Sequence, residues 1–386
     1  MPQGTSESVR RANLSAVLRD LYLHGPSSRS ALGSSSGRNR STIASLVADL
    51  ASLGLVTEKD PEHHGAAGRP SPVVSLRPET AAIAVNPEID MLTITLVGLD
   101  TAIIQTIRHS YRRIPSAEEA ISVTAAVIAG LELTGYRITG IGVAVPGQVR
   151  AEDGVIANAP HLHWVDEPFG GPLAAATGYP VRVANDAALG ALAENDFGAG
   201  RGVSDLLYVN GGASGIGSGA VSNGRLLRGA AGFAGELGHV RVSSSPATDS
   251  AGIAGTLEAM VTRAELLETL GLDSPTASEL AARLLADRSA RTRKVVLRSL
   301  DHLGTGLAAA VNLLNPQMIV LGGFLASLLA YEREYLERAT FAASLAPSAR
   351  GVRIAPSQLG ENLLAIGAAQ LAFEPLLENP ASVASI

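Results

Sequence analysis

Apolar residues near the start of the chain recur with the spacing of one helix face. Leucine and valine occupy positions i, i+3, i+4 and i+7 from Leu14 to Leu21, and His24-Gly25-Pro26 then ends this helix. A second short helix fits Ser28 to Leu32, and residues 33–37 favour a turn. A third helix begins near Asn39 as its N-cap and, before Gly54 ends it, places four apolar side chains on one stripe: Ile43, Leu46, Val47 and Leu50.

The other face of this third helix carries cationic and hydroxyl groups: Arg40, Ser41, Thr42 and Ser45. Two short β runs follow at residues 55–57 and 73–76, and the polar loop after the first run leads to Gly68-Arg69-Pro70. The pattern predicts a winged helix-turn-helix whose third helix enters the major groove of DNA. Arg69 would contact a phosphate or a narrow minor groove. The alternative is a three-helix accessory or dimerisation domain.

The pattern changes near Glu79, where short β runs begin to alternate with helices. We expect strands at residues 81–85, 92–96, 103–107, 138–145, 181–184 and 206–209, and a helix from 116 to 133. Alternation over this length predicts an α/β body of two lobes. The predicted domains are a DNA-binding domain at residues 1–78 and a body at residues 79–386.

Charge follows the same division. The formal net charge of the 386 residues is −6, but residues 1–78 contain nine cationic and six acidic residues, so this segment carries +3 and the body carries −9. The asymmetry is typical of a small anion-binding module joined to an acidic body. The longest apolar run, Met318 to Leu329, is too short to span a bilayer, and residues 1–10 contain no apolar stretch of signal-peptide type. We therefore expect a cytoplasmic protein with no membrane partner.

The absence of cysteine removes several kinds of chemistry. The chain has no cysteine at all, which excludes disulfides, Cys-rich zinc fingers, iron–sulfur clusters and a cysteine nucleophile. A metal site would need His, Asp and Glu alone.

A glycine-rich run from residue 211 to 219 is the first feature that could bind a ligand. Gly215, Gly217 and Gly219 leave backbone N–H groups free to surround a phosphate, although the same residues suit a tight β-hairpin. The run lacks the Gly-Lys-Ser/Thr ending of a P-loop.

Two further groups of polar residues are candidates. Asn185-Asp186 follows an apolar strand, where ligand sites of open α/β sheets gather, so Asp186 is either a general base or the N-cap of the next helix. Glu236 and His239 lie on a glycine-rich turn, and Glu258 follows nineteen residues after His239. Carboxylates and an imidazole of this kind bind the vicinal hydroxyls of sugars.

Taken together, these residues resemble the ROK family of repressors, open reading frames and sugar kinases. The resemblance runs from about residue 10 to Ala372 and rests on several motifs in this order: Val145-Pro146-Gly147, Asn185-Asp186-Ala187, the glycines at 215, 217 and 219, Ala234 to His239, Leu257-Glu258, Asn315-Pro316, Leu321-Gly322-Gly323 and Gly367-Ala368-Ala369.

The resemblance implies a ribonuclease-H-like body of the actin and hexokinase type, with a sugar bound between its lobes. It implies lobes at about 79–184 plus the C-terminal helix and at 185–365. It also implies that the sugar contacts are Asn185, Asp186, Glu236, His239 and Glu258. Asp186 would be the catalytic base if the protein were a kinase.

Two departures from the family pattern favour a regulator without a cofactor. Family kinases carry Asp-x-Gly-x-Thr where this chain has Val85-Asn86-Pro87-Glu88-Ile89-Asp90, which lacks the magnesium-organising aspartate and both glycines, and Pro87 removes a backbone donor. We expect kinase activity to be lost, with the three glycines as the remnant of a phosphate loop. The family's zinc cysteines fall by position on Asp249, Ala251 and Thr256, so we expect no metal at His239.

The predicted DNA-binding domain at residues 1–78 also resembles the winged helix of ROK repressors. Their turn usually reads Gly-Leu-Ser, whereas this chain has Gly37-Arg38-Asn39, and we expect Arg38 to face the DNA backbone. The predicted function is a sugar-responsive transcriptional repressor that binds double-stranded operator DNA and a monosaccharide effector as a homodimer or tetramer. The alternatives are a sugar kinase fused to a DNA-binding domain, and a constitutive DNA-binding protein whose body only dimerises.

Overall fold

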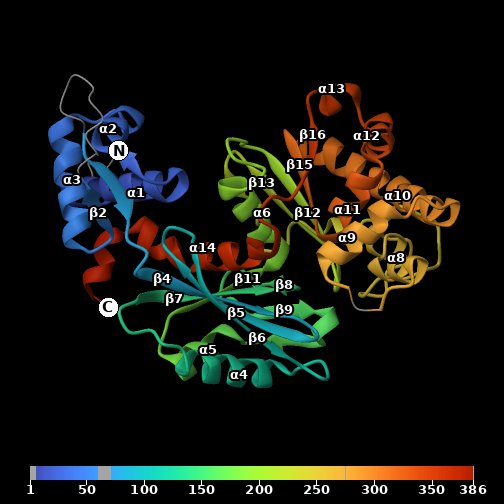
Figure 1. The fold of residues 1–386 in the computed structure, drawn as a ribbon, viewed down its shortest axis with the longest axis horizontal. Helices are drawn as coiled ribbons and strands as arrows, with labels where there is room; N and C mark the ends of the chain where they lie inside the picture. Colours follow the sequence, from blue (N-terminus) through green and yellow to red (C-terminus); the bar gives the residue numbers. More distant parts are fainter. Residues whose placement is uncertain (1–5, 60–70, 274, 386) are drawn as a thin grey trace.

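The computed structural model describes residues 6–59, 71–273 and 275–385, which form a helical module followed by two lobes (Figure 1). The module consists of α1 (Ser6–His24), β1 (Ser27–Ser28), α2 (Arg29–Ser36), α3 (Arg40–Ser52), β2 (Val56–Lys59) and β3 (Val73–Leu76). The predicted apolar stripes of α1 and α3 are buried against each other, with Leu18, Leu21, Ile43 and Leu50 fully covered. The wing has a third, very short strand, because β1 pairs with β3 in the order β1-β3-β2.

The second helix is longer than the sequence predicted. It continues through residues 33–36, which we expected in a turn, and ends at Gly37, which adopts a left-handed conformation at φ 66°. The serines of this segment bond back within the helix, since Ser34 Oγ donates to the carbonyl of Ser30 and Ser36 Oγ donates to the carbonyl of Leu32. Because these hydroxyls bond to carbonyls of the preceding helical turn, they do not compete for other backbone groups, and the helix continues through this segment. The predicted N-cap of α3 is confirmed, because Asn39 accepts from the Thr42 N–H at 2.8 Å.

The first lobe is a five-stranded sheet with helices on both faces. Its strands are β4 (Thr80–Pro87), β5 (Met91–Gly98), β6 (Ile103–Ser110), β7 (Arg137–Val145) and β11 (Val181–Asn185), in the order β11-β7-β4-β5-β6. The first three are antiparallel neighbours, and β7 and β11 add in parallel. Alternate residues of β4 face the two sides, so Ile83 packs with α4 (Ala117–Ala129) and α5 (Gly170–Thr177), whereas Ala84 packs with α14 (Leu363–Glu378).

A small antiparallel sheet extends from the end of β7 toward the second lobe. It consists of β8 (Gln148–Val149), β9 (Ile156–Ala159) and β10 (Trp164–Glu167), with the short 3-10 helix η1 (Pro160–Leu162) between the last two strands. Trp164 anchors it, because its indole is buried and donates to the carbonyl of Pro115.

The second lobe repeats the strand order and directions of the first. Its strands are β12 (Leu206–Gly212), β13 (Gly215–Ser222), β14 (Arg225–Leu226), β15 (Met318–Gly322) and β16 (Arg353–Pro356), with β12, β13 and β14 antiparallel and β15 and β16 parallel. Its helical elements are η2 (Leu237–His239), α7 (Leu257–Met260), α8 (Arg263–Leu270), α9 (Ala277–Ala286), α10 (Ala290–Leu314), α11 (Gly323–Tyr331), α12 (Arg333–Ala342) and α13 (Ala346–Ala349), and η3 (Gly360–Asn362) and η4 (Pro380–Ser385) flank α14. The predicted two-lobed α/β architecture is therefore confirmed.

Two helices cross between the lobes and exchange partners. Helix α6 (Asp186–Phe197) follows the last strand of the first sheet but packs on β12 and β13 of the second, whereas α14 follows the second sheet and packs on the first. The helices contact each other, and Figure 1 shows α14 running beneath the N-terminal module. A Cβ on Gly367 would lie 2.7 Å from the Leu189 carbonyl oxygen, so this crossing requires glycine.

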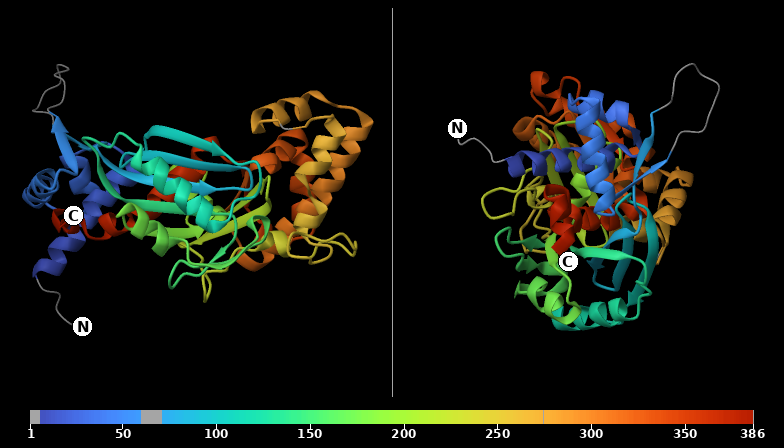
Figure 2. Two further views of the ribbon diagram at one scale, coloured as in Figure 1. Left: turned by 90° about the horizontal axis from the view of Figure 1, so that it is seen from below. Right: turned by 90° about the vertical axis from the view of Figure 1, so that its left-hand side faces the viewer.

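The N-terminal module lies directly on α14, as both views of Figure 2 also show. Ser15 Oγ donates to the Leu377 carbonyl at 2.6 Å, and Arg19 forms an ion pair with Glu374 at 2.8 Å. Beside this pair Tyr22 makes edge-on contacts with Phe197 and Phe373. The module and the first lobe consequently share one hydrophobic core. No helix within residues 6–59, 71–273 and 275–385 is long and apolar enough to cross a membrane.

The predicted domain limits can be compared with these elements. The limit at residue 78 falls between β3, which ends at Leu76, and β4, which begins at Thr80. The predicted change of lobe at residue 185 falls at the junction of β11 and α6.

Candidate functional site

The five candidate ligand residues of the body line a single cavity between the lobes. The cavity has a volume of about 320 Å³ and includes Asn185, Asp186, Glu236, His239 and Glu258 in its wall. The first lobe contributes Gly147, Gln148, Asn158 and His161, and the second contributes Ser214, Gly215, Ile216, Gly217, Ser250 and Ile253. Residues separated by more than seventy positions thus share one concave surface.

Asn185 and Asp186 occupy the turn from β11 into α6. Asn185, not Asp186, is the N-cap: its Oδ1 accepts from the Ala188 N–H at 2.8 Å, and its amide donates to the Gly147 carbonyl at 3.0 Å. Of the two interpretations of Asp186, the N-cap is therefore wrong, because that position is filled by its neighbour. Asp186 is the first helical residue, and its Oδ1 accepts from the Ala187 N–H at 2.7 Å while the carboxyl group lines the cavity.

The environment of Asp186 favours its protonated form. Burial is the main cause, and the negative charges of Glu88 and Glu236 add to it, so the pKa of Asp186 rises to about 7 despite the hydrogen bond from Ala187. A carboxyl group with such a pKa exchanges a proton with a bound hydroxyl near neutral pH.

The glycine run forms the hairpin of β12 and β13 rather than a loop. A Cβ on Gly215 would lie 2.1 Å from Glu258 Oε2, and one on Gly219 would lie 2.7 Å from the carbonyl oxygen of Ala187. Gly217 faces the Ala187 side chain. Glycine is therefore needed here so that α6 and Glu258 can approach the strand. Of the two interpretations of the glycine run, the structure shows the tight β-hairpin. Contact of these glycines with a phosphate stays a prediction.

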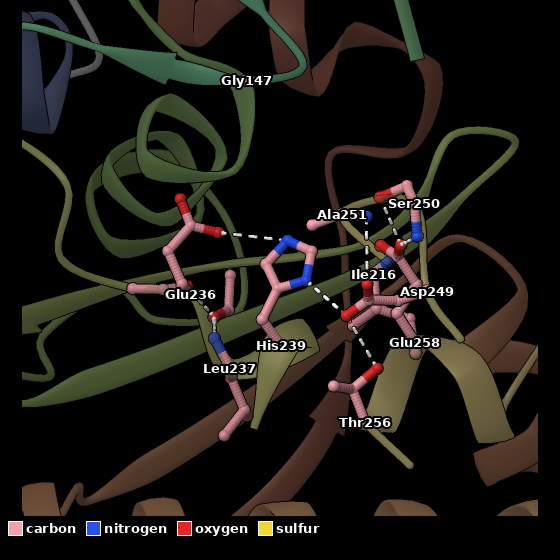
Figure 3. Close-up of polar contacts among 12 residues, drawn as sticks. Gly147, Ile216, Glu236, Leu237, His239, Asp249, Ser250, Ala251, Thr256 and Glu258 are labelled. Atoms are coloured by element: carbon pink, nitrogen blue, oxygen red, sulfur yellow. Dashed lines mark hydrogen bonds and ion pairs between the residues drawn. The ribbon is translucent and has the colours of Figure 1, made fainter. Parts of the chain in front are cut away.

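Glu236, His239 and Asp249 form a chain of polar contacts that runs from the cavity wall to the loop behind it (Figure 3). His239 Nε2 lies 3.9 Å from Glu236 Oε2, and His239 Nδ1 lies 2.8 Å from Asp249 Oδ2. Burial would lower the pKa of His239, but the hydrogen bond with Asp249 and the charges of Glu258, Asp249 and Glu236 outweigh it and raise the pKa. For Asp249, hydrogen bonds from His239, Ile253 and Thr256 outweigh burial and lower the pKa.

Glu258 is held at both of its carboxylate oxygens. Oε2 accepts from the Ile216 N–H at 3.1 Å, and Oε1 accepts from Ser250 through its N–H at 3.0 Å and its hydroxyl at 2.6 Å. Thr256 caps the short helix α7 on which Glu258 lies. The carboxylate is thus fixed in the cavity wall, with His161 Nε2 at 4.0 Å from Oε1.

The sequence analysis did not identify several residues of this site. His161 lies on η1, and its Nε2 has no hydrogen-bond partner among the described residues. Asn158, Gln148 and Ser250 line the same cavity, and Asp249 lies behind it. A histidine or asparagine next to a short strand carries no signal of its own, because its place in the cavity depends on the small sheet formed by β8, β9 and β10.

A second cavity adjoins the first, and Asn210 lines both. Its volume is about 930 Å³, and its wall includes Asn86, Glu88, Tyr208 and Gly323. Asn86 donates to the Ala144 carbonyl at 3.0 Å, so one of its amide protons is used within the sheet. Glu88 supplies a carboxyl group two residues farther along, and its pKa is raised by burial and by Asp90.

In the N-terminal module, α3 presents the predicted polar face to the outside. Arg40, Ser41 and Ser45 are exposed, Thr42 is half-buried, and Ser41 Oγ donates to Asn39 Oδ1 at 2.9 Å. Arg38 is used differently from the expectation: its guanidinium donates to Asn13 Oδ1 at 3.1 and 2.6 Å and to the Ser36 carbonyl at 3.2 Å. Arg38 thus ties α1 to the turn before α3. Arg69 and the rest of Gly68-Arg69-Pro70 lie outside the described residues.

Comparison with known proteins agrees with this architecture. The model of the ROK family matches residues 83–374, which cover most of the chain. The chain belongs to the ROK family. The resemblance seen in the sequence motifs is confirmed, and the N-terminal module lies ahead of the ROK match.

Among curated proteins, the chain is similar to both repressors and kinases. It is 26% identical to a putative xylose repressor of Caldicellulosiruptor sp. over 98% of this chain and 99% of that protein, and 25% identical to the xylose repressor of Bacillus subtilis over 96% and 97%. It is 34% identical to a glucokinase of Halalkalibacterium halodurans, over 48% of this chain and 61% of the glucokinase.

Among solved structures, a ROK family transcriptional regulator that is a homologue of the Escherichia coli MLC protein matches 96% of this chain and 97% of its own, with a TM-score of 0.79 and 23% identity. A Streptomyces griseus ROK glucokinase in complex with glucose and AMPPNP matches 76% of this chain and 99% of its own, with a TM-score of 0.64 and 23% identity. The kinase match thus spans a smaller share of this chain than the regulator match does.

Proposed function

We propose that this ROK protein is a sugar-responsive transcriptional repressor whose operator affinity depends on a monosaccharide bound between the lobes. The observation that carries the proposal is the position of α6. Its first residue, Asp186, lines the cavity, and its last residue, Phe197, contacts Tyr22 of the N-terminal module. The similarity to xylose repressors over nearly their whole length supports the same function.

The DNA-binding half of the proposal rests on α3. Its exposed cation and hydroxyl groups lie on the face opposite the buried stripe, and Asp49 at its far end is neutralised by an ion pair with Arg10. A face of this kind donates hydrogen bonds to phosphates and base edges. Two copies in a two-fold dimer would contact half-sites about one or two helical turns apart, so we include a homodimer or a dimer of dimers in the proposal.

The sugar-binding half rests on the cavity wall. Asp186, Glu236 and Glu258 supply acceptors for hydroxyl groups, and His239 Nε2 lies beside Glu236. The cavity of about 320 Å³ has the size of a monosaccharide site, at the lower end of ligand pockets in general. A sugar that touches both walls would bind one lobe arrangement better than another and so shift the population of states.

The test is a nuclease footprint of the full-length protein on the DNA flanking its own gene. The footprint is repeated with D-xylose, D-glucose, N-acetyl-D-mannosamine and their phosphates. We expect a protected site whose occupancy changes with one of these sugars, and we expect the change to disappear in Glu236→Ala and His239→Ala. No protected site under any condition would contradict the regulator. A protected site that no sugar alters, in the wild type or either variant, would support the constitutive alternative.

A sugar kinase fused to a DNA-binding module is the second candidate, and one observation favours it. Glu88 places a carboxyl group in the cavity of about 930 Å³ next to the Asp186 site, although Asn86 replaces the aspartate of the family motif and Glu88 itself replaces the first glycine. Sugar-dependent ATP consumption that is abolished by Asp186→Asn would establish a kinase. We expect none, because phosphoryl transfer depends on a metal-organising carboxylate and on backbone donors at the phosphates.

A further inference from the structure

Asp249 lies at the centre of the loop that connects His239 with α7. Its Oδ2 accepts from His239 Nδ1 at 2.8 Å and from the Thr256 hydroxyl at 2.9 Å. Its Oδ1 accepts from the N–H groups of Ala251 at 3.0 Å and Ile253 at 2.8 Å. The side chain of Asp249 has no exposed surface, so all of its bonding capacity is directed at this loop and at His239.

The same loop is where the family resemblance implies a zinc ion. The positions of the three cysteines hold a carboxylate at Asp249, a methyl at Ala251 and a hydroxyl at Thr256. His239 Nδ1 already bonds to the carboxylate, and Thr256 Oγ1 both donates to Asp249 and accepts from the Ala259 N–H. Within residues 6–59, 71–273 and 275–385 no group of three or more His, Asp or Glu residues is arranged to hold a metal. The donor set does not fit zinc, which takes four N, O or S ligands in a tetrahedron.

The hydrogen bond to Asp249 fixes the protonation of the His239 ring nitrogens. An ionised carboxylate only accepts hydrogen bonds, so His239 Nδ1 must carry a proton. In the neutral ring the lone pair is then at Nε2, the atom that lies 3.9 Å from Glu236 Oε2 at the cavity. Asp249 therefore decides which nitrogen of His239 meets a ligand.

The same aspartate also places a contact of Glu258. The turn closed by the Ala251 and Ile253 N–H groups includes Ser250, which donates twice to Glu258 Oε1. Figure 3 shows His239, Asp249, Ser250 and Glu258 gathered around this turn. One buried carboxylate thus connects two residues of the cavity wall.

We propose that Asp249 is a positioning residue that takes the place of the family's zinc ion, holding the loop closed and fixing His239 and Glu258 for contact with the sugar. The inference about sugar contact rests on the proposed function, whereas the inference about the loop and the His239 tautomer does not. The experiments below separate the two.

The first experiment measures the His239 tautomer by ¹⁵N NMR of the full-length protein in the absence of sugar, at a pH high enough to make the ring neutral, because the pKa of His239 is raised. The wild type is expected to show Nδ1 protonated. In Asp249→Asn the side-chain oxygen keeps the two backbone N–H bonds of the turn, so the amide group faces His239 and donates to Nδ1. We expect the proton to move to Nε2 while the protein stays folded. A ring whose tautomer is the same in the wild type and the variant would overturn the proposal.

The second experiment uses Asp287→Asn as a matched control. Asp287 also accepts from a backbone N–H, that of Ser289, and from a threonine hydroxyl, that of Thr292, but it lies between α9 and α10 and does not line the cavity. Affinity is measured by calorimetry with D-xylose and D-glucose. For whichever sugar binds the wild type, we expect Asp249→Asn to lower the affinity by tenfold or more. Asp287→Asn should change the affinity by less than twofold. Equal losses of sugar affinity in both variants would show that Asp249 only stabilises the fold and would contradict its positioning role. If neither sugar binds the wild type, the proposed function loses support while the tautomer result still decides the role of Asp249.

The third experiment concerns the metal itself. We expect purified wild-type protein to contain no stoichiometric zinc by elemental analysis, and its melting temperature to be unchanged by 1,10-phenanthroline or by added Zn²⁺. One zinc per chain, lost to the chelator together with several degrees of melting temperature, would overturn the replacement of zinc by Asp249.

Discussion

Arg38 and Arg40 lie two positions apart at the start of α3, yet their side chains have different partners. The Arg38 guanidinium is bound to Asn13 and to the Ser36 carbonyl, whereas the side chain of Arg40 is exposed and forms no hydrogen bond or ion pair with another residue in the described part of the chain. The sequence analysis placed both on DNA, Arg40 in the major groove from the exposed helix face and Arg38 at the DNA backbone from the turn before the helix. The structure distinguishes them through a contact from α1, which sequence spacing does not contain.

These contacts predict opposite effects of two alanine substitutions. Arg40→Ala is expected to weaken operator binding by about tenfold, the loss of one charged DNA contact, and to leave thermal stability unchanged. Arg38→Ala is expected to cost about 1 kcal/mol of stability, because it leaves Asn13 and a carbonyl without their donors. Operator titrations at two salt concentrations, together with thermal melts, check both. Equal loss of DNA affinity in the two variants without any change in melting would contradict this assignment.

Asp186 gives a pH-dependent prediction. Its pKa is raised to about 7 in the folded chain from an ordinary value near 3.8, mainly by burial. The folded state therefore holds a proton that the unfolded state releases between these values, so this group makes the protein less stable as pH rises from about 4 to 7, and the full loss is present above pH 7.

Asp186→Asn removes that loss. We expect the variant to be more stable than the wild type by about 2 kcal/mol at pH 8, a value discounted because the carboxyl group lines the cavity and is only partly enclosed, and by much less at pH 5. Urea unfolding at the two pH values measures the difference. Asp153→Asn is the control, because the bond from Arg150 lowers the pKa of Asp153, so that variant should lose stability slightly. A gain at pH 5 as large as that at pH 8 would refute the argument.

At the scale of elements, the position of α6 depends on its close approach to β13. The N-terminal turn of α6 lies over Gly217 and Gly219, and its C-terminal end is held by Glu194, whose buried carboxylate accepts from the N–H groups of Ala199, Gln358 and Leu359. The sequence predicted a helix after Asn185 but not what it packs on, because nothing local states that the helix crosses to the other sheet.

Gly219→Ala tests this packing. The added Cβ would lie 2.7 Å from the Ala187 carbonyl oxygen and 2.9 Å from the Ala191 Cβ, so α6 must move away from the strand. We expect a loss of about 2 kcal/mol and weaker sugar binding, since Asp186 moves with the helix. Gly171→Ala is the matched control: it lies in α5 with nothing within 4 Å of the new atom, and it should be neutral or slightly stabilising. Chemical denaturation and calorimetry compare the two variants.

At the scale of the whole molecule, a short series of packed residues connects the proposed sugar site with the N-terminal module. The cavity lies at one end of α6, and at the other end Phe197 packs against Tyr22, which also contacts Phe373 of α14. The N-terminal module therefore packs on both helices that cross between the lobes. A change of lobe closure that shifts α6 against α14 would also shift the surface on which α1 lies.

Phe197→Leu is expected to weaken this coupling without removing the sugar site. The leucine keeps most of the apolar volume but loses the edge-on aromatic contact with Tyr22. We expect sugar affinity to stay within twofold, while the ratio of operator affinities with and without sugar falls several-fold. Phe341→Leu in α12, which packs against the separate core of the second lobe, is the control and should leave that ratio unchanged. An unaltered ratio in Phe197→Leu would show that the signal does not pass through this contact.

The sequence by itself determined the local elements and the kinds of residue that form the site. Apolar periodicity predicted α1, α3 and the main strands, because this signal depends on neighbours within a few positions. The motifs around Asp186, Glu236 and Glu258 supplied separate candidates, and their resemblance to the ROK family implied that they share one site. The tertiary structure alone decided that Asn185 caps α6, that Arg38 binds Asn13 and that His161 lines the cavity. It also showed that Asp249 bonds to His239, in a loop for which the sequence predicted only the loss of zinc. The cap joins residues three positions apart, where the sequence left Asn185 and Asp186 as equivalent candidates, whereas the other three contacts join segments that meet only when the chain folds, so their geometry is absent from any local pattern.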